Sequence, residues 1–161
     1  YRIAGNNAAK NAELMASLKS EGKYKITDDM KAQLADFYGN YATEAEDAAT
    51  IKKIYEACGY VIDTHTSVAA TVYDKYRKET GDTTKTVIAS TASPYKFSGS
   101  VLAAIGKDTN ADEFGLVDEL AEVSKIPVPA SLAALKDKEV RFTKVIDKAD
   151  MKDYIYSALG I

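Results

Sequence analysis

Apolar residues recur at intervals of three and four along most of the chain, a spacing that predicts helices. Residues 3–19 are alanine-rich with larger apolar side chains toward one side, and Gly22 follows as a helix stop. Thr27, followed by two aspartates, is typical of an N-cap and opens a second predicted helix. The apolar stripe of this second helix consists of Met30, Leu34, Phe37, Tyr38 and Tyr41.

Two stronger start signals lie in the middle of the sequence. Residues 43–46, Thr-Glu-Ala-Glu, match a capping box and begin a helix that ends at Gly59. Asp63 and Thr64 are suited to cap the next helix, which we expect over residues 65–79. The expected buried faces are Ala48, Ile51, Tyr55 and Cys58 in the first helix and Val68, Ala69, Val72 and Tyr76 in the second.

Three short segments are apolar and β-branched enough to indicate extended structure. Residues 60–62 read as a short strand or an extended entry, residues 86–89 as a strand buried on both sides, and residues 140–142 as a third short strand. Ser93 and Pro94 then supply an N-cap and a first helical position, because proline needs no N–H partner there. The inward stripe of that helix is Phe97, Val101, Ala104 and Ile105.

Helical spacing returns in the C-terminal part at residues 116–123 and 130–135 and after Asp147, where Met151, Tyr154, Ile155 and Ala158 form one face. The pattern therefore predicts an α/β fold, a helix-rich part of a three-layer αβα architecture. Two or three strands make a poor sheet by themselves, so we expect the small sheet to be completed by strands from outside this chain. No linker divides the sequence, and residues 1–161 are treated as a single fragment domain.

The amino-acid composition and the net charge argue against several classes of function. With 46% apolar and 28% charged residues, a net charge of −3 and no basic block, the chain has little to attract nucleic acid. No apolar run approaches the ~20 residues of a membrane span, and no cluster of Cys and His offers metal ligands. The single cysteine, Cys58, is expected to be a buried inert thiol and fits a reducing cytoplasm. The start at Tyr1 suggests a piece of a longer polypeptide.

Candidate chemistry gathers where the predicted strand at 86–89 meets the following helix. In open α/β sheets this kind of junction is where ligands bind. It carries three small hydroxyl side chains and a nearby cation: Ser90, Thr91, Ser93 and Lys96. A serine- and threonine-rich turn explains Ser93 as a cap but does not require the hydroxyls of Ser90 and Thr91 at the strand end. His65, the one histidine, is either a capping or packing residue or, as a neutral imidazole beside Asp63, a group that orients a ligand or acts as a base.

Two segments resemble motifs of the threonine synthases. Residues 60–69, Tyr-Val-Ile-Asp-Thr-His-Thr-Ser-Val-Ala, are similar to the family's Asp/Glu-Pro-His-Thr/Ala-Ala-Val, and residues 90–97, Ser-Thr-Ala-Ser-Pro-Tyr-Lys-Phe, to its Ser/Gly-Thr-Ala-His-Pro-Ala-Lys-Phe. Their order and spacing also suit the C-terminal portion of that family. The sequence departs from the pattern at Thr64, where the family often has proline, and at Ser93, where it often has histidine.

The resemblance implies a fold type II enzyme that uses pyridoxal 5'-phosphate to convert O-phosphohomoserine and water into L-threonine and phosphate. It implies that Thr91 faces the pyridine nitrogen of the cofactor, that Asp63, His65 and Ser90 line the same crevice, and that Lys96 either contacts the substrate phosphate or supports the turn. The family's cofactor-binding lysine and Gly/Asn loop have no counterpart in this sequence.

That absence leads us to expect no catalytic residue in this chain and no activity from the chain alone. The expected partners are the remainder of its own polypeptide and, through the uncovered crevice, a second copy. Two alternatives remain open: a free-standing, non-catalytic helical interaction module, and a threonine-synthase-like phospho-lyase.

Overall fold

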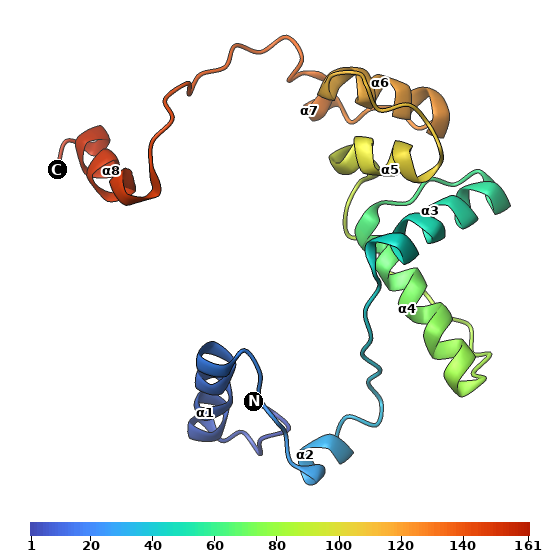
Figure 1. Cartoon of the computed structure of the whole chain (residues 1–161), viewed down its shortest axis with the longest axis vertical. Coiled ribbons are helices and arrows are strands. Elements are labelled where there is room, and N and C mark those ends of the chain that lie inside the picture. Colours follow the sequence, from blue (N-terminus) through green and yellow to red (C-terminus); the bar gives the residue numbers. More distant parts are fainter. The chain divides into compact units, whose positions relative to one another are not determined.

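The computed structural model describes residues 1–161 and consists of helices joined by loops, with no strand (Figure 1). Two compact units divide it, Tyr1–Ser124 and Lys125–Ile161. The helices of the first are α1 Ala8–Glu21, α2 Asp28–Ala32, α3 Glu44–Cys58, α4 Thr64–Thr80, the 3-10 helix η1 Pro94–Phe97, α5 Ser98–Ala104 and α6 Glu113–Ser124. The second contains α7 Ala130–Ala133, the 3-10 helix η2 Lys148–Asp150 and α8 Met151–Leu159.

The predicted helix ends in the middle of the chain are confirmed. Thr43 and Glu46 form a reciprocal capping box: the Thr43 N–H donates to Glu46 Oε2 at 2.8 Å, and the Glu46 N–H donates to Thr43 Oγ1 at 3.3 Å. Helix α3 ends at Gly59, whose φ of 71° lies in the left-handed region that favours glycine. Asp63 caps α4 with its side chain.

Helices α3, α4, α5 and α6 contain a core of their own. Helix α3 packs against both α4 and α5, and α5 packs against α6, as Figure 1 shows. The side chains that lie below 2% exposed are Ile51, Val61, Asp63, Ser67, Val101, Leu102 and Leu120. Two of these are polar, which marks the start of α4 as unlike the rest of the core.

Several expectations about buried faces are wrong. The second predicted helix stops at Ala32, and Phe37 and Tyr41, placed on its apolar stripe, are 75% and 71% exposed. Helix α4 buries Thr66, Ser67, Ala70 and Thr71 rather than the predicted valines and tyrosine, because small side chains let α3 approach closely. Cys58 is exposed, so the expected buried thiol is wrong as well.

The expected sheet is not present. Residues 60–62, 86–89 and 140–142 are loops, although Val61 and Ile62 are buried as the entry to α4. Val87 is 91% exposed and Phe142 is 82% exposed, the opposite of strands buried on both sides. A strand needs a neighbour to accept and donate its backbone hydrogen bonds, and no second extended segment of this chain pairs with any of the three. The helix-rich character is confirmed, and the α/β assignment is not.

Candidate functional site

The site is built around the buried carboxylate of Asp63, which is 1% exposed at the start of α4. Its Oδ1 accepts the backbone N–H groups of His65 at 2.8 Å and Thr66 at 3.2 Å. Its Oδ2 accepts the hydroxyl of Thr66 and lies 3.4 Å from the hydroxyl of Ser90. Both carboxylate oxygens are therefore engaged, and Asp63 ties the loop before α5 to the first turn of α4.

These hydrogen bonds determine the charge state of Asp63. Burial by itself would raise the pKa of the carboxyl group, but the Thr66 hydroxyl and the N–H groups of Thr66 and His65 outweigh it, so the pKa lies below its ordinary value. Asp63 is thus an ionised, fully bonded structural carboxylate rather than a proton acceptor. A general base needs an oxygen open to its proton donor, and Asp63 offers none.

The second expected motif meets the first through Ser90. The hydroxyl oxygens of Ser90 and Thr66 lie 2.9 Å apart, which joins positions that are 24 residues apart in sequence. Ser93 accepts the Tyr95 N–H at 3.3 Å and begins η1 with Pro94 at its first position, as the sequence predicts. Thr91 follows Ser90 and is exposed, and its hydroxyl is not part of the Asp63 network.

The side chain of His65 is 60% exposed, and its Nδ1 lies 3.7 Å from Asp63 Oδ1. Its ring sits 5.0 Å from the Phe97 ring, tilted by 32°, and its Nδ1 is 3.3 Å from the Thr64 hydroxyl. Lys96 is exposed, with its ammonium 5.6 Å from the centre of the Phe97 ring. The segment from Ser90 to Phe97 is therefore held at both ends by α4, through Ser90 at one end and Phe97 at the other.

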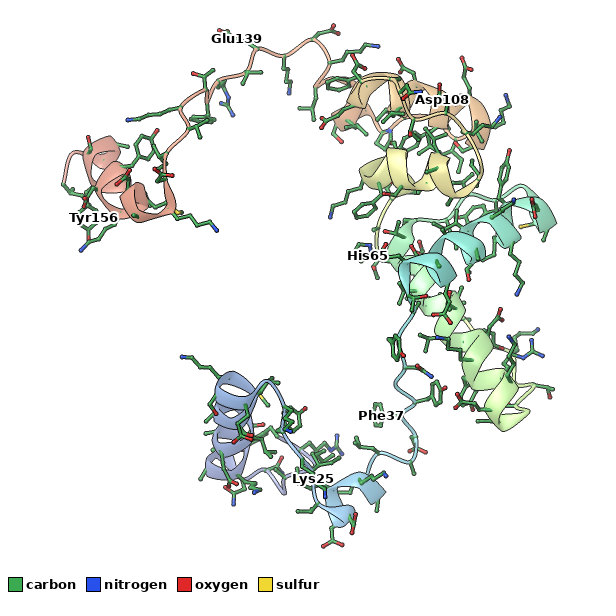
Figure 2. The ribbon with its side chains drawn as sticks, viewed as in Figure 1. Lys25, Phe37, His65, Asp108, Glu139 and Tyr156 are labelled. Carbon is green, nitrogen blue, oxygen red and sulfur yellow. The ribbon has the colours of Figure 1, made fainter.

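A cavity of about 630 Å³ opens beside this junction, between the first turns of α3 and α4 and helix α5. Figure 2 shows His65 at the start of α4, where it contributes to the wall. Phe97 and Ser100 line the cavity from η1 and α5, and Asp47 lines it from α3. Burial raises the pKa of Asp47, and one of its carboxylate oxygens, Oδ1, is buried without a hydrogen-bond partner.

The structure therefore brings Asp63, His65 and Ser90 together and leaves Thr91 and Lys96 exposed on the same short segment. Sequence reasoning missed Thr66, the hydroxyl that links the two motifs, and Asp47. The signal for Thr66 was present, since a threonine three residues after an aspartate N-cap can bond back to it. No group of three or more His, Cys, Asp or Glu side chains is arranged to hold a metal ion. None of the helices has the length and apolar character needed to cross a membrane.

Fold and site together define a helical protein in which two motif segments meet at a buried carboxylate. The sequence matches the family described as "Threonine synthase, C-terminal" over residues 66–155, and the chain belongs to that family.

Relatives in the family include both synthases and synthase-like proteins. The chain is 34% identical over 107 residues to "Threonine synthase-like 1" of Mus musculus, a match that covers 65% of this chain and 14% of the mouse protein. It is 26% identical over 133 residues to "Threonine synthase" of Corynebacterium glutamicum, covering 79% of this chain and 27% of that protein.

A solved structure gives the same assignment. The structure of threonine synthase from Brucella melitensis with bound PLP superposes with a TM-score of 0.57 and 26% identity, covering 77% of this chain and 29% of that one. The chain thus spans less than a third of the length of each of these three proteins.

Proposed function

We propose that this chain forms the part of a threonine synthase active site that faces the ring of pyridoxal phosphate. The complete enzyme would convert O-phosphohomoserine and water into L-threonine and phosphate. The observation that carries the proposal is the contact between Ser90 and the Asp63–Thr66 pair, since it brings the two family-like motifs to one place. Family membership and a PLP-bound structural relative support the same reading.

The residues present fit one side of the cofactor. The Thr91 hydroxyl is exposed at a turn that Ser90 holds in place, and it is suited to a hydrogen bond with the pyridine nitrogen. A hydroxyl in that position holds less positive charge on the ring than a carboxylate would. When bound, pyridoxal phosphate supplies the electron sink for bond cleavage at the substrate. His65, at the wall of the adjacent cavity, and the exposed Lys96 ammonium are positioned to orient the substrate, with Lys96 suited to its phosphate.

The remaining parts of the cofactor site would come from elsewhere in the polypeptide. The nine glycines of this chain are scattered and form no phosphate-binding loop, and no lysine lies in the family's cofactor-binding context. In the complete enzyme the exposed segment 86–89 would pair with strands of the missing part and complete a three-layer αβα fold. As a separate fragment, the chain would associate with the missing part of the polypeptide or with a second copy of itself. The complete enzyme would act in the cytoplasm.

The proposal is tested by comparing the chain alone with the full-length polypeptide that carries it. On addition of pyridoxal phosphate, we expect the chain alone to develop no absorbance band at about 420 nm and to yield no specific lysine adduct after borohydride reduction. The full-length polypeptide should show both and release threonine from O-phosphohomoserine. A specific lysine adduct in the chain alone, or no threonine from the full-length protein, would contradict the proposal.

A phospho-lyase that eliminates phosphate without adding water is the second candidate. Its support is the 34% identity to a relative named threonine synthase-like. The products separate the two: the synthase releases threonine with the phosphate. The lyase releases phosphate and an enamine, which water then hydrolyses to a 2-oxo acid and ammonia. An intact polypeptide that binds no cofactor at all would indicate the non-catalytic module instead.

A further inference from the structure

Asp63 Oδ2, Thr66 Oγ1 and Ser90 Oγ form a chain of hydrogen bonds. The number of protons that each group can donate determines which group is the donor in each bond. A carboxylate accepts hydrogen bonds and donates none, and each hydroxyl has a single proton to donate. Asp63 is ionised, because the hydrogen bonds it accepts hold its pKa below the ordinary value. The contact between Thr66 Oγ1 and Asp63 Oδ2 must therefore use the Thr66 proton.

The direction of the next contact follows from the first. Since the Thr66 proton is already committed, the 2.9 Å contact with Ser90 must use the Ser90 proton. Ser90 also lies within reach of a second inward acceptor, Asp63 Oδ2 at 3.4 Å. With its proton donated to Thr66, the exposed Ser90 hydroxyl is left to accept a hydrogen bond from a ligand.

We propose that Thr66 is a positioning residue: it commits the Ser90 proton inward, so that of the two adjacent hydroxyls, Ser90 and Thr91, the one that donates to a ligand is Thr91. The identity of that ligand rests on the proposed function, whereas the hydrogen-bond order does not. Burial supports the inner bond, since Thr66 is 8% exposed and Asp63 is 1% exposed, so water has little access to compete for it. Ser90, the outer donor, is exposed and faces the solvent side of the junction.

The neighbouring titratable groups are few. The Asp63 charge adds to burial in raising the pKa of Asp47 in α3, and the His65 ring approaches Asp63 with Nδ1 at 3.7 Å from Oδ1. Neither donates to Oδ2, the oxygen that receives the hydroxyl chain. Removing the Thr66 hydroxyl would leave Ser90 with one long bond, to Asp63, and would loosen the turn that carries Thr91.

Thr66→Val and Thr66→Ser in the 161-residue chain test the inference. Valine matches the shape of threonine without the hydroxyl, and serine restores the hydroxyl without the methyl group. Carbon-13 NMR titration of Asp63 should give a pKa below the ordinary value in the native chain and in Thr66→Ser, and a higher pKa in Thr66→Val, because burial then acts with one lowering hydrogen bond fewer. The steady-state 15N NOE of Thr91 should fall in Thr66→Val and recover in Thr66→Ser.

Ser90→Ala provides a second variant if Thr66→Val does not fold. It removes the outer donor and leaves the Thr66–Asp63 bond, so the Asp63 pKa should stay low while the Thr91 NOE falls. Unchanged Asp63 titration and Thr91 NOE in Thr66→Val, or no recovery in Thr66→Ser, would overturn the inference. The proposed function can fail independently of this inference. In that case the NMR changes would appear as expected in the 161-residue chain, but the full-length polypeptide would make no threonine.

Discussion

The helices of residues 43–124 and those of residues 125–161 differ in the packing that supports them. In the first region, helices α3 to α6 enclose side chains such as Val101, Leu102 and Leu120 that are completely buried. In the second, no residue is buried, and the apolar side chains of α8 include Met151 at 52% and Leu159 at 67% exposed. The candidate site lies in the region that has its own core, so its geometry depends on packing that this chain supplies.

The largest expected effect comes from opening that core. Leu102→Ala should lower the free energy of unfolding by about 3 kcal/mol, because it removes buried methyl groups and leaves a cavity. Leu159→Ala, the same substitution at an exposed position of α8, should change it by less than about 0.5 kcal/mol. Urea unfolding followed by circular dichroism measures both. Equal decreases in the free energy of unfolding in the two variants would mean that the two regions do not differ in how much their packing contributes to stability.

The next largest effect on the free energy of unfolding is expected at one of two aspartates that precede helices. Asp63→Ala should cost about 2 kcal/mol, since it removes an N-cap and leaves the buried Thr66 hydroxyl without its acceptor. Asp147, which precedes η2, makes no capping bond through its side chain, so Asp147→Ala should cost less than about 0.5 kcal/mol. Chemical denaturation at pH 7 gives both values. A similar cost at the two positions would contradict the described role of Asp63.

The smallest effect is a pH dependence with opposite signs at two buried carboxyl groups. The lowered pKa of Asp63 stabilises the fold above about pH 4, the ordinary range of aspartate, and this stability is lost as the pH falls through the lower folded value. The raised pKa of Asp47 acts in reverse: its stabilising contribution is present below about pH 4 and is lost as the pH rises through the raised value.

Asp47→Asn separates the two contributions. It should raise the free energy of unfolding at pH 7 by up to about 1 kcal/mol and leave it unchanged at pH 3, because the native carboxyl group is then neutral. Asp137→Asn, an exposed position of the second region, serves as the control and should alter stability by less than about 0.5 kcal/mol at pH 7. A destabilised Asp47→Asn variant at pH 7 would show that the charge of Asp47 is favourable.

Local signals in the sequence predicted the helix ends well because caps act over three or four residues. The capping box at Thr43, the aspartate cap at Asp63 and the Ser93–Pro94 start all appear as expected. Buried faces were predicted less well, since they depend on the neighbour. Helix α4 packs through small polar residues, which a search for large apolar side chains overlooks.

The predictions that are wrong concern segments whose structure requires a neighbouring strand. Residues 86–89 have the composition of a buried strand, yet Val87 is 91% exposed because no neighbouring strand lies within the chain. At the site, motif spacing pointed to Ser90 and Asp63 but not to the Thr66 hydroxyl between them. Such a link joins distant parts of the sequence and becomes visible only in three dimensions.

The most direct test of the account replaces the two adjacent hydroxyls of the junction in the full-length polypeptide. Thr91→Val should lower the rate of threonine formation from O-phosphohomoserine at least about tenfold, the cost of one lost hydrogen bond to the ring, while Thr91→Ser retains most of it. Ser90→Ala should reduce the rate less than Thr91→Val does, since the Ser90 proton points inward. Near-native activity of Thr91→Val, with cofactor bound as in the native protein, would contradict the central claim that this junction faces the cofactor ring.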